Sequence, residues 1–178
     1  METELLLGKV VSKYIKDELA DKINFLKKKN ITPGLAAILV GNDPASEIYV
    51  NSKSKVFKSN GCFSETYKMN ANSSEEEILE LIEKLNNNNK IHGILVQLPL
   101  PSHIESKKIL NHVDPKKDVD GFHPLNLGHL LEGSPSVIPC TPNGIIKILE
   151  FYNIETSGKH TVIIGRSNIV GKPMFALL

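Results

Sequence analysis

Residues 35–53 read LAAILVGNDPASEIYVNSK, and their pattern predicts the architecture of the chain. Residues 35–40 form a continuous apolar run, which is typical of a strand that is buried on both faces. Asp43 and Pro44 follow and suit the N-cap and the first residue of a helix, which we expect to end near Asn60. A buried strand that leads directly into a helix is the building unit of a parallel α/β sheet.

The same alternation of strands and helices continues along the rest of the chain. We expect helices over residues 4–29, 103–111 and 142–152, another helix that ends near residue 85, and strands over residues 62–69, 91–97 and 160–164. Ser73 and Ser74 each have a glutamate three residues later, the pattern of a capping box at the start of a helix. This order predicts a mainly parallel sheet with right-handed crossovers and helices on both faces. Ligands of such sheets bind outside the carboxyl ends of the strands.

The composition is that of an ordinary soluble protein. The 178 residues are 40% hydrophobic and 23% charged, with a net charge of +1, which argues against nucleic acid or an anionic membrane as the main partner. No apolar stretch has the length needed to span a bilayer, and the early Glu2 and Glu4 differ from a signal or transit peptide. Neither the two cysteines nor the six histidines have the spacing of metal ligands. We therefore expect a cytoplasmic protein without a metal site.

Three polar residues follow the expected strands at the edge where ligands bind. Tyr49 and Lys53 are four residues apart, so they share one face of the first expected helix. A phenol beside a lysine can position a planar ring and help to keep the amine partly neutral for proton transfer. Gln97 ends the third expected strand and can accept a proton from the lysine while it donates to a carbonyl. The plainer interpretation is an aromatic at the core edge, a solvated lysine and a polar strand end.

A second acidic stretch, residues 117–124, reads KDVDGFHP. Asp118 and Asp120 flank one valine and are followed by Gly121, which suits a tight turn. The functional alternative is a carboxylate that accepts two hydrogen bonds from a heterocycle edge. From spacing alone we favour the turn.

Residues 139–142, PCTP, are interpreted as a linker with Thr141 as a helix N-cap. Cys140 has no recognisable histidine partner, so a role as nucleophile is not expected. His112 and His123 are expected in loops or at the surface.

Arg166 is the only arginine among 21 basic residues. It lies in a loop, GRSNIVGKP over residues 165–173, that follows the last expected strand and precedes a helix start. A guanidinium can hold a phosphate through two parallel hydrogen bonds, whereas lysine offers a point charge. The layout is that of a phosphate site, although the dinucleotide fingerprint G-x-G-x-x-G is absent.

Five segments together resemble the bifunctional methylenetetrahydrofolate dehydrogenase/methenyltetrahydrofolate cyclohydrolase family. These segments are GNDPASEIYVNSKSK (41–55), GILVQLPLP (93–101), KDVDGFHPLNLG (117–128), PCTPNGI (139–145) and VIIGRSNIVGKPM (162–174). They occur in the order in which the family has them and cover the whole chain. Family members continue well beyond this length and complete a nucleotide-binding domain. In this chain the resemblance implies only one strand of that domain and the first residues of the helix that follows it.

The resemblance implies an α/β fold in which a parallel-sheet folate-binding catalytic domain, residues 1–119, precedes the start of a Rossmann-like NADP-binding domain, residues 120–178. It implies NADP-dependent oxidation of 5,10-methylenetetrahydrofolate, followed by hydrolysis to 10-formyltetrahydrofolate, in a homodimer. Lys53 would be the acid/base of the hydrolysis, Tyr49 would stack on the folate ring, and Gln97 would orient Lys53. The remaining implied contacts are Val96, Leu98, Pro99 and Asp120 with the substrate, and Gly165, Arg166 and Ser167 with NADP.

Two other classes share parts of this pattern. Short-chain dehydrogenases also pair Tyr and Lys four residues apart, but their glycine-rich loop precedes the Tyr–Lys helix, whereas the loop at residues 165–171 follows it. The second alternative is a truncated folate-binding fragment that lacks dehydrogenase activity, because a lone strand leaves backbone groups unpaired and apolar faces uncovered.

Overall fold

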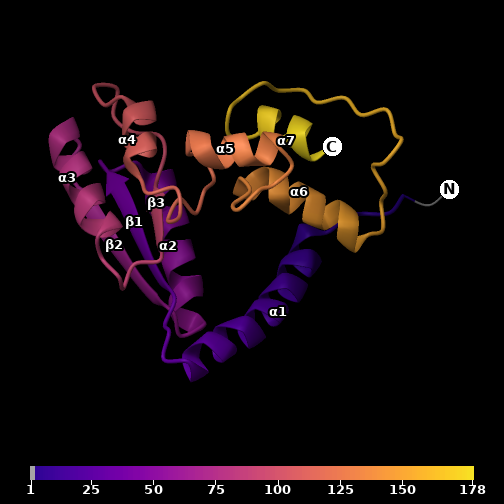
Figure 1. Cartoon of the computed structure of the whole chain (residues 1–178), viewed down its shortest axis with the longest axis horizontal. Coiled ribbons are helices and arrows are strands. Elements are labelled where there is room, and N and C mark those ends of the chain that lie inside the picture. Colours follow the sequence, from indigo (N-terminus) through magenta and orange to yellow (C-terminus); the bar gives the residue numbers. More distant parts are fainter. Residues whose placement is uncertain (1–2) are drawn as a thin grey trace. The chain divides into compact units, whose positions relative to one another are not determined.

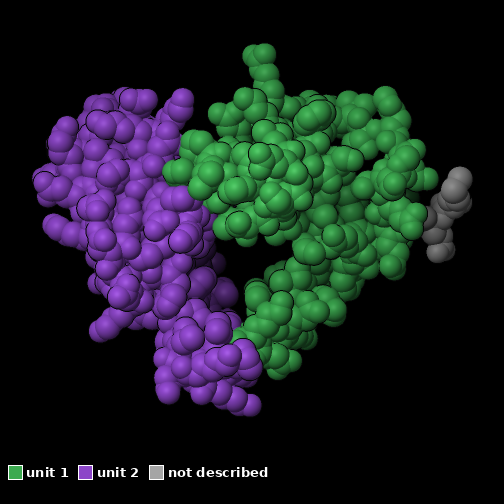
Figure 2. All heavy atoms as spheres, viewed as in Figure 1, with its two compact units in different colours: residues 1–22, 120–178 green, residues 23–119 purple. Residues whose placement is uncertain are grey.

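The computed structural model describes residues 3–178, which form two compact units (Figure 2). One unit comprises residues 23–119, and the other combines residues 120–178 with the N-terminal segment up to Lys22. The first helix, α1 (Gly8–Lys28), therefore contributes to both units. We describe each unit by itself.

The unit of residues 23–119 is built on a three-stranded parallel sheet in the order β2-β1-β3 (Figure 1). The strands are β1 (Gly34–Val40), β2 (Phe63–Met69) and β3 (Gly93–Val96). The helices that cover them are α2 (Pro44–Ser59), α3 (Glu75–Asn86) and α4 (Ser106–His112). The predicted parallel α/β fold is confirmed for this unit.

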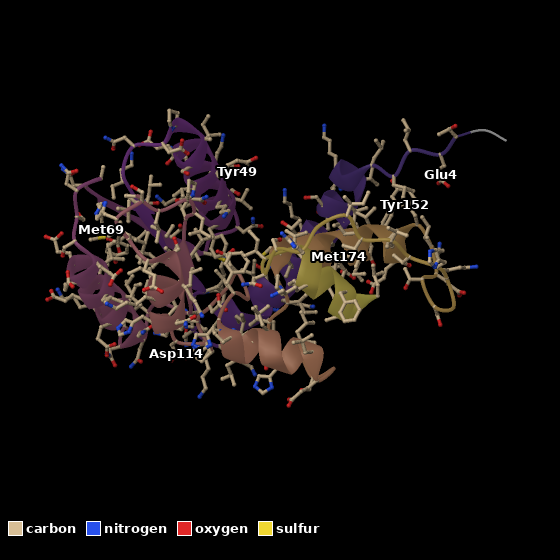
Figure 3. The ribbon with its side chains drawn as sticks, turned by 90° about the horizontal axis from the view of Figure 1, so that it is seen from above. Glu4, Tyr49, Met69, Asp114, Tyr152 and Met174 are labelled. Atoms are coloured by element: carbon tan, nitrogen blue, oxygen red, sulfur yellow. The ribbon has the colours of Figure 1, made fainter. Side chains whose placement is uncertain are left out.

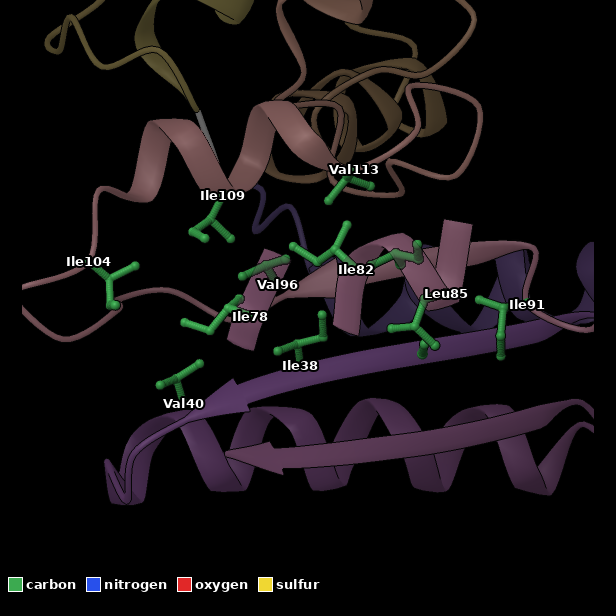
Figure 4. Close-up of a cluster of buried hydrophobic side chains, with 12 residues drawn as sticks. Ile38, Val40, Ile78, Ile82, Leu85, Ile91, Val96, Ile104, Ile109 and Val113 are labelled. Atoms are coloured by element: carbon green, nitrogen blue, oxygen red, sulfur yellow. The ribbon is translucent and has the colours of Figure 1, made fainter. Parts of the chain in front are cut away.

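Alternation along β1 divides the core between the two faces of the sheet. Ile38 and Val40 pack with Ile78 and Ile82 of α3 in the larger cluster (Figure 4). Leu35 and Ala37, together with Leu95 of β3, pack on the other face against Val50 of α2. Because every residue of β1 is buried, this strand reads as one apolar run.

Local chemistry fixes the ends of the helices in this unit. The Asp43 side chain accepts a hydrogen bond from the Ser46 N–H at 2.8 Å, as predicted for the N-cap of α2. The hydrogen bonds from Ser46 also lower the pKa of Asp43. The capping box of α3 joins Ser74 and Glu77, so Ser74 is the N-cap and not Ser73.

The second unit is helical in the described residues. Its elements are the N-terminal part of α1 with α5 (Pro124–Leu131), α6 (Cys140–Phe151) and α7 (Gly171–Leu177). The ring of Phe151 lies 5.6 Å from the ring of Tyr14 on α1, measured between centroids. The Leu7 N–H donates to the hydroxyl of Tyr152 at 2.9 Å, and Tyr152 is labelled in Figure 3. These contacts join α1 and the residue before it to the end of α6 and its C-cap.

The strand predicted at residues 160–164 is wrong. These residues form no β-bridge with any other described segment, and Ile164 is fully exposed. A strand exists only when a neighbour accepts and donates its backbone hydrogen bonds. The apolar sequence of this segment therefore could not make a strand by itself.

The second unit also differs from the sequence predictions in two helix starts. Thr141 is not an N-cap, because α6 begins at Cys140, two residues before the expected start, and Pro139 is its N-cap. Pro142 is tolerated within the first turn, where an N–H has no partner inside the helix. Helix α5 was not predicted. Pro124 occupies its first position, which is a common place for proline. His123 is its N-cap, and a ring nitrogen of His123 accepts a hydrogen bond from the Leu125 N–H at 3.1 Å.

Candidate active site

Helix α2 places Lys53 and Tyr49 beside its sheet-facing stripe. Val50 and Phe57 of α2 pack on the sheet, and Lys53 lies three residues after the first and four before the second. Lys53 is consequently half-buried. Tyr49 lies one turn before Lys53 and is 63% exposed (Figure 3), so its ring is accessible to a planar ligand.

Gln97 continues the pairing of β3 by one residue, because its N–H donates to the Ile38 carbonyl at 2.9 Å. Leu95 faces α2 and Val96 faces α3, so alternation directs the Gln97 side chain to the α2 side of the sheet. Lys53 lies on the helix that covers this same side. The strand end and the helix therefore bring an amide and an amine to one face.

The Gln97 side chain has one satisfied and one unsatisfied end. Its Nε2 donates to the Leu98 carbonyl at 2.7 Å, whereas its buried Oε1 accepts no hydrogen bond from the described residues. Among residues 3–178, the Lys53 Nζ in turn has no hydrogen-bond acceptor or ion-pair partner. Buried amide oxygens are almost always paired. The α2 side of the sheet thus holds an acceptor that lacks a donor and a donor that lacks an acceptor.

The residues at the end of β3 and in the loop after it differ in their exposure to solvent. The Val96 side chain belongs to the core on the α3 face, so only its backbone borders the strand end. Leu98 is half-buried and Pro99 is exposed, and the peptide bond between them is cis.

The acidic stretch runs beside β3 before it reaches Asp120. Asp118 forms a parallel bridge with Ile94, and the Ile94 N–H donates to the Lys117 carbonyl at 2.7 Å. Asp118 is buried, whereas Asp120 is half-buried and begins the second unit. Gly121 has φ +70°, which confirms the predicted turn at this glycine.

Lys117 has a structural role that its sequence context did not indicate. Its Nζ donates to the carbonyls of Leu85, Asn86 and Asn88 at 3.0, 2.6 and 3.0 Å. A cation at the end of α3 satisfies carbonyls that have no partner within the helix. Nothing in the local sequence around Lys117 signals this, because the acceptors lie about thirty residues earlier.

The loop of residues 165–171 folds back on itself before α7. The Ser167 hydroxyl accepts from the N–H groups of Val170 and Gly171 at 3.1 and 3.3 Å. A Cβ at position 171 would lie 2.5 Å from the Gly165 carbonyl oxygen, so only glycine allows this close approach. Arg166 is exposed, and its guanidinium has no hydrogen-bond or ion-pair partner among the described residues.

Residues 3–178 contain no candidate membrane span and no cluster of metal-ligating side chains. No described helix combines the length and apolarity that a membrane crossing requires. Within the same residues, no three His, Cys, Asp or Glu side chains gather where they could hold a metal ion.

Comparison with known proteins identifies the family from both parts of the chain. The tetrahydrofolate dehydrogenase/cyclohydrolase catalytic domain matches residues 6–120, and the NAD(P)-binding domain of the same family matches residues 139–178. This chain belongs to the tetrahydrofolate dehydrogenase/cyclohydrolase family. The resemblance noted from the sequence and the predicted fold class, including the start of an NAD(P)-binding domain, are thereby confirmed.

Individual members of the family align along almost the whole chain. The bifunctional protein FolD of Streptococcus pyogenes serotype M5 is 56% identical over 177 residues, which are 99% of this chain and 62% of that protein. The crystal structure of the bifunctional enzyme FolD from Campylobacter jejuni superposes with a TM-score of 0.95 at 51% identity, covering 98% of this chain and 62% of that one. The Trypanosoma brucei FolD, solved with NADP cofactor and inhibitor, superposes with a TM-score of 0.94 at 33% identity, covering 99% and 61%. The chain therefore spans about three fifths of the length of these relatives.

Proposed function

We propose that this chain carries the folate chemistry of its family. The reaction is the NADP-dependent oxidation of 5,10-methylenetetrahydrofolate to the methenyl form, followed by hydrolysis to 10-formyltetrahydrofolate. The observation that carries the proposal is the Lys53 amine on the same side of the sheet as the unsatisfied Gln97 oxygen, with the exposed Tyr49 ring one turn away. A hydrolytic site needs a proton-transfer group and a residue that orients it.

In the hydrolytic step, water attacks the methenyl carbon, and a neutral Lys53 amine accepts the proton of that water. The methenyl bridge carries a positive charge, which disfavours a second positive charge on a neighbouring amine. The carbinol that results has lost one proton to Lys53. The C–N bond to N5 then breaks as the carbinol O–H releases its proton to solvent and becomes the formyl carbonyl, and the Lys53 ammonium returns the first proton to N5. Gln97 Oε1 accepts a hydrogen bond from Lys53 Nζ and fixes its direction, while Tyr49 stacks on the folate ring.

Further substrate contacts come from the two segments that follow β3. We assign to them the Val96 backbone, Leu98 and Pro99 of the loop, and the Asp120 carboxylate, which suits the donor edge of a pterin. Val96, Leu98 and Pro99 lie at or just after the carboxyl end of β3, where ligands of parallel sheets bind.

The loop of residues 165–171 fits a phosphate-bearing cofactor. The space beside Gly165 is open, since a Cβ there would meet no atom within 4 Å, and the unpartnered Arg166 guanidinium suits the phosphate that distinguishes NADP from NAD. Gly165, Arg166 and Ser167 would hold NADP. When bound, NADP⁺ supplies the hydride acceptor of the oxidation. The T. brucei relative, which was solved with NADP, supports this choice.

The proposal includes the division of the chain into two domains. We assign residues 1–119 to the folate-binding catalytic domain and residues 120–178 to the start of the NADP-binding domain. We further propose that the protein acts in the cytoplasm and as a homodimer.

Separate assays of the two reactions test the proposal. Lys53→Met should lower the rate of methenyltetrahydrofolate hydrolysis at least about 100-fold, whereas Lys55→Met, an exposed lysine on the same helix, should leave it unchanged. Equal rates for the two variants would contradict the role of Lys53. NADP⁺ reduction with methylenetetrahydrofolate is measured on the same samples. Hydrolysis without reduction would restrict the function to the catalytic domain, and neither activity would favour the folate-binding fragment.

A further inference from the structure

A cavity lies at the amino ends of the strands of the parallel sheet. Its volume is about 490 Å³, which is within the range of sites for small molecules. The residues that line it come from the turn before β1, from the start of β2 and from the segment between α3 and β3, all within the unit of residues 23–119. β1 is seven residues long, so about 20 Å separates the cavity from the carboxyl end of the sheet, where Gln97 lies. The cavity is therefore separate from the candidate active site.

A row of three residues crosses the sheet beside the cavity. Phe63 of β2 pairs with Gly34 of β1 in the parallel register, and Gly34 in turn exchanges two hydrogen bonds with His92, the residue before β3. Alternation directs all three positions to the α3 side of the sheet, where the larger core cluster lies. Gly34 carries no side chain, and a Cβ there would clash with the Lys90 carbonyl oxygen. The row thus has a ring at each end and no side chain at its centre.

Two apolar side chains form one wall of the cavity. Phe63 is 45% exposed and Ile31 is 40% exposed, so the core does not cover either of them. Aromatic rings pack favourably against each other in offset or edge-to-face arrangements. This wall therefore suits a planar, apolar group.

The segment before β3 gives the cavity hydrogen-bond donors and a positive charge. The His92 Nδ1 accepts from the Gly34 N–H at 3.1 Å, so in the neutral ring the proton is on Nε2, which is left as a donor. The Lys90 Nζ has no acceptor or ion-pair partner among residues 3–178, while the Lys90 N–H is held by the Asn88 Oδ1 at 2.9 Å. None of the described residues that line the cavity is acidic. The cavity consequently favours a negatively charged group.

We propose that this cavity binds a small aromatic carboxylate. The ring lies against Phe63 and Ile31, and the carboxylate accepts hydrogen bonds from the His92 Nε2 and the Lys90 Nζ. Hydrogen bonds that involve charged partners are about twice as strong as neutral ones. A bare inorganic anion would leave the apolar wall in water, and a neutral aromatic compound would offer the ammonium no opposite charge. The two features together select a ligand that has both a ring and a carboxylate.

Titration of the 178-residue chain with 2-naphthoate, followed through amide resonances in NMR, tests the proposal. Binding should be saturable and should shift the resonance of Gly34, whose N–H donates to His92. Gly41, at the opposite end of β1, is the matched control and should not shift. The neutral analogue 2-naphthalenemethanol should bind about tenfold more weakly, because it carries no charge opposite to that of Lys90. No saturable shift of Gly34, an equal shift of Gly41, or equal affinity for the two compounds would overturn the proposal.

Substitutions locate the ligand, with circular dichroism of each variant as the check on its fold. Lys90→Met should weaken 2-naphthoate binding about tenfold, whereas Lys84→Met, which removes an exposed charge of α3 outside the cavity, should leave it unchanged. Phe63→Ala should weaken binding about 3- to 10-fold through the loss of the ring contact. Tyr49→Ala should not change it, since Tyr49 belongs to the candidate active site.

Unchanged affinity in Lys90→Met or in Phe63→Ala would overturn the proposal, as would an equal loss with both lysine variants. Loss of binding in Tyr49→Ala would place the ligand in the candidate active site and overturn it as well. Because 2-naphthoate binding requires no turnover, these outcomes are independent of the proposed folate chemistry.

Discussion

Val119 lies directly against Gly93. A Cβ at position 93 would come within 2.3 Å of the Val119 Cγ1. This contact places the segment of residues 117–119 beside β3, where Ile94 and Asp118 form their bridge. The acidic stretch can follow the strand only because residue 93 has no side chain.

Gly93→Ala should therefore destabilise the protein, by about 1–3 kcal/mol, because the added methyl group overpacks a buried contact. Chemical denaturation followed by circular dichroism measures the change. In a Val119→Ala background the same substitution should cost less, since the clashing methyl is gone. Equal destabilisation by Gly93→Ala in both backgrounds would show that the contact with Val119 does not cause it.

Ser74→Ala should lower the free energy of unfolding by about 1 kcal/mol, because it removes the hydroxyl that accepts from the Glu77 N–H at the start of α3. Ser73→Ala is the matched control and should have little effect. Thermal unfolding of the two variants side by side separates the two serines. A larger effect at Ser73 would reverse the assignment of the N-cap.

The ion pair between Glu75 of α3 and Lys108 of α4 predicts a pH dependence of stability. The hydrogen bond from Lys108, together with that from the Glu105 N–H, lowers the pKa of Glu75, and Glu75 raises the pKa of Lys108. The Glu75 contribution is therefore present above the ordinary glutamate range and is lost as pH falls through its lowered pKa. The Lys108 contribution is present below the ordinary lysine range and is lost as pH rises through its raised pKa.

Glu75→Gln should accordingly be less stable than the parent at neutral pH, and the difference should shrink in acid. Denaturant titrations at several pH values measure this difference. Glu80→Gln, an exposed glutamate on the same helix, is the control and should show no such convergence. A Glu75→Gln difference that is constant with pH would contradict the ion pair.

Gln97→Ala should lower the rate constant of methenyltetrahydrofolate hydrolysis about 10- to 100-fold, the cost of losing one hydrogen bond to the ammonium that Lys53 becomes as it accepts the proton. The KM should change much less, because the amide orients Lys53 and is not the main substrate contact. Gln97→Glu keeps an acceptor at the same position and should recover part of the loss. A variant that changes only KM would argue against the positioning role.

Arg166→Lys should weaken NADP⁺ binding about tenfold, because an ammonium cannot reproduce two parallel hydrogen bonds to phosphate. Affinity for NAD⁺, which lacks that phosphate, should not change. Equilibrium titration with both nucleotides makes the comparison. Lys172→Met removes a charge from the same loop region and serves as the control for a general electrostatic effect.

The sequence predicted those elements whose causes are local. The apolar run at β1 and the carboxylate of Asp43 before Pro44 act within a few residues of the structure that they specify. The pairing of Tyr49 and Lys53 on one helix face follows from their spacing alone. The five segments that occur in the order of the family then identified it, and the matches to both of its domains confirm this.

The elements that the sequence predicted wrongly or left open depend on distant partners. Residues 160–164 have the composition of a strand, but no described segment supplies the backbone groups that a strand needs. Ser73 and Ser74 have the same pattern, and only the path of the chain selects the second. Helix α5 was missed because its start depends on a histidine ring, which is not among the usual N-cap side chains.

The sequence alone was sufficient for the strand–helix order of residues 34–112, for the family and for the residue types that carry the chemistry, because periodicity and capping act through neighbouring residues. Only the tertiary structure decided that Gln97 turns an unsatisfied oxygen towards the α2 side of the sheet, that Val119 occupies the space above Gly93, and that Lys117 closes the end of α3. Each of these depends on groups brought together from separate segments, since packing and hydrogen-bond satisfaction are properties of the folded chain.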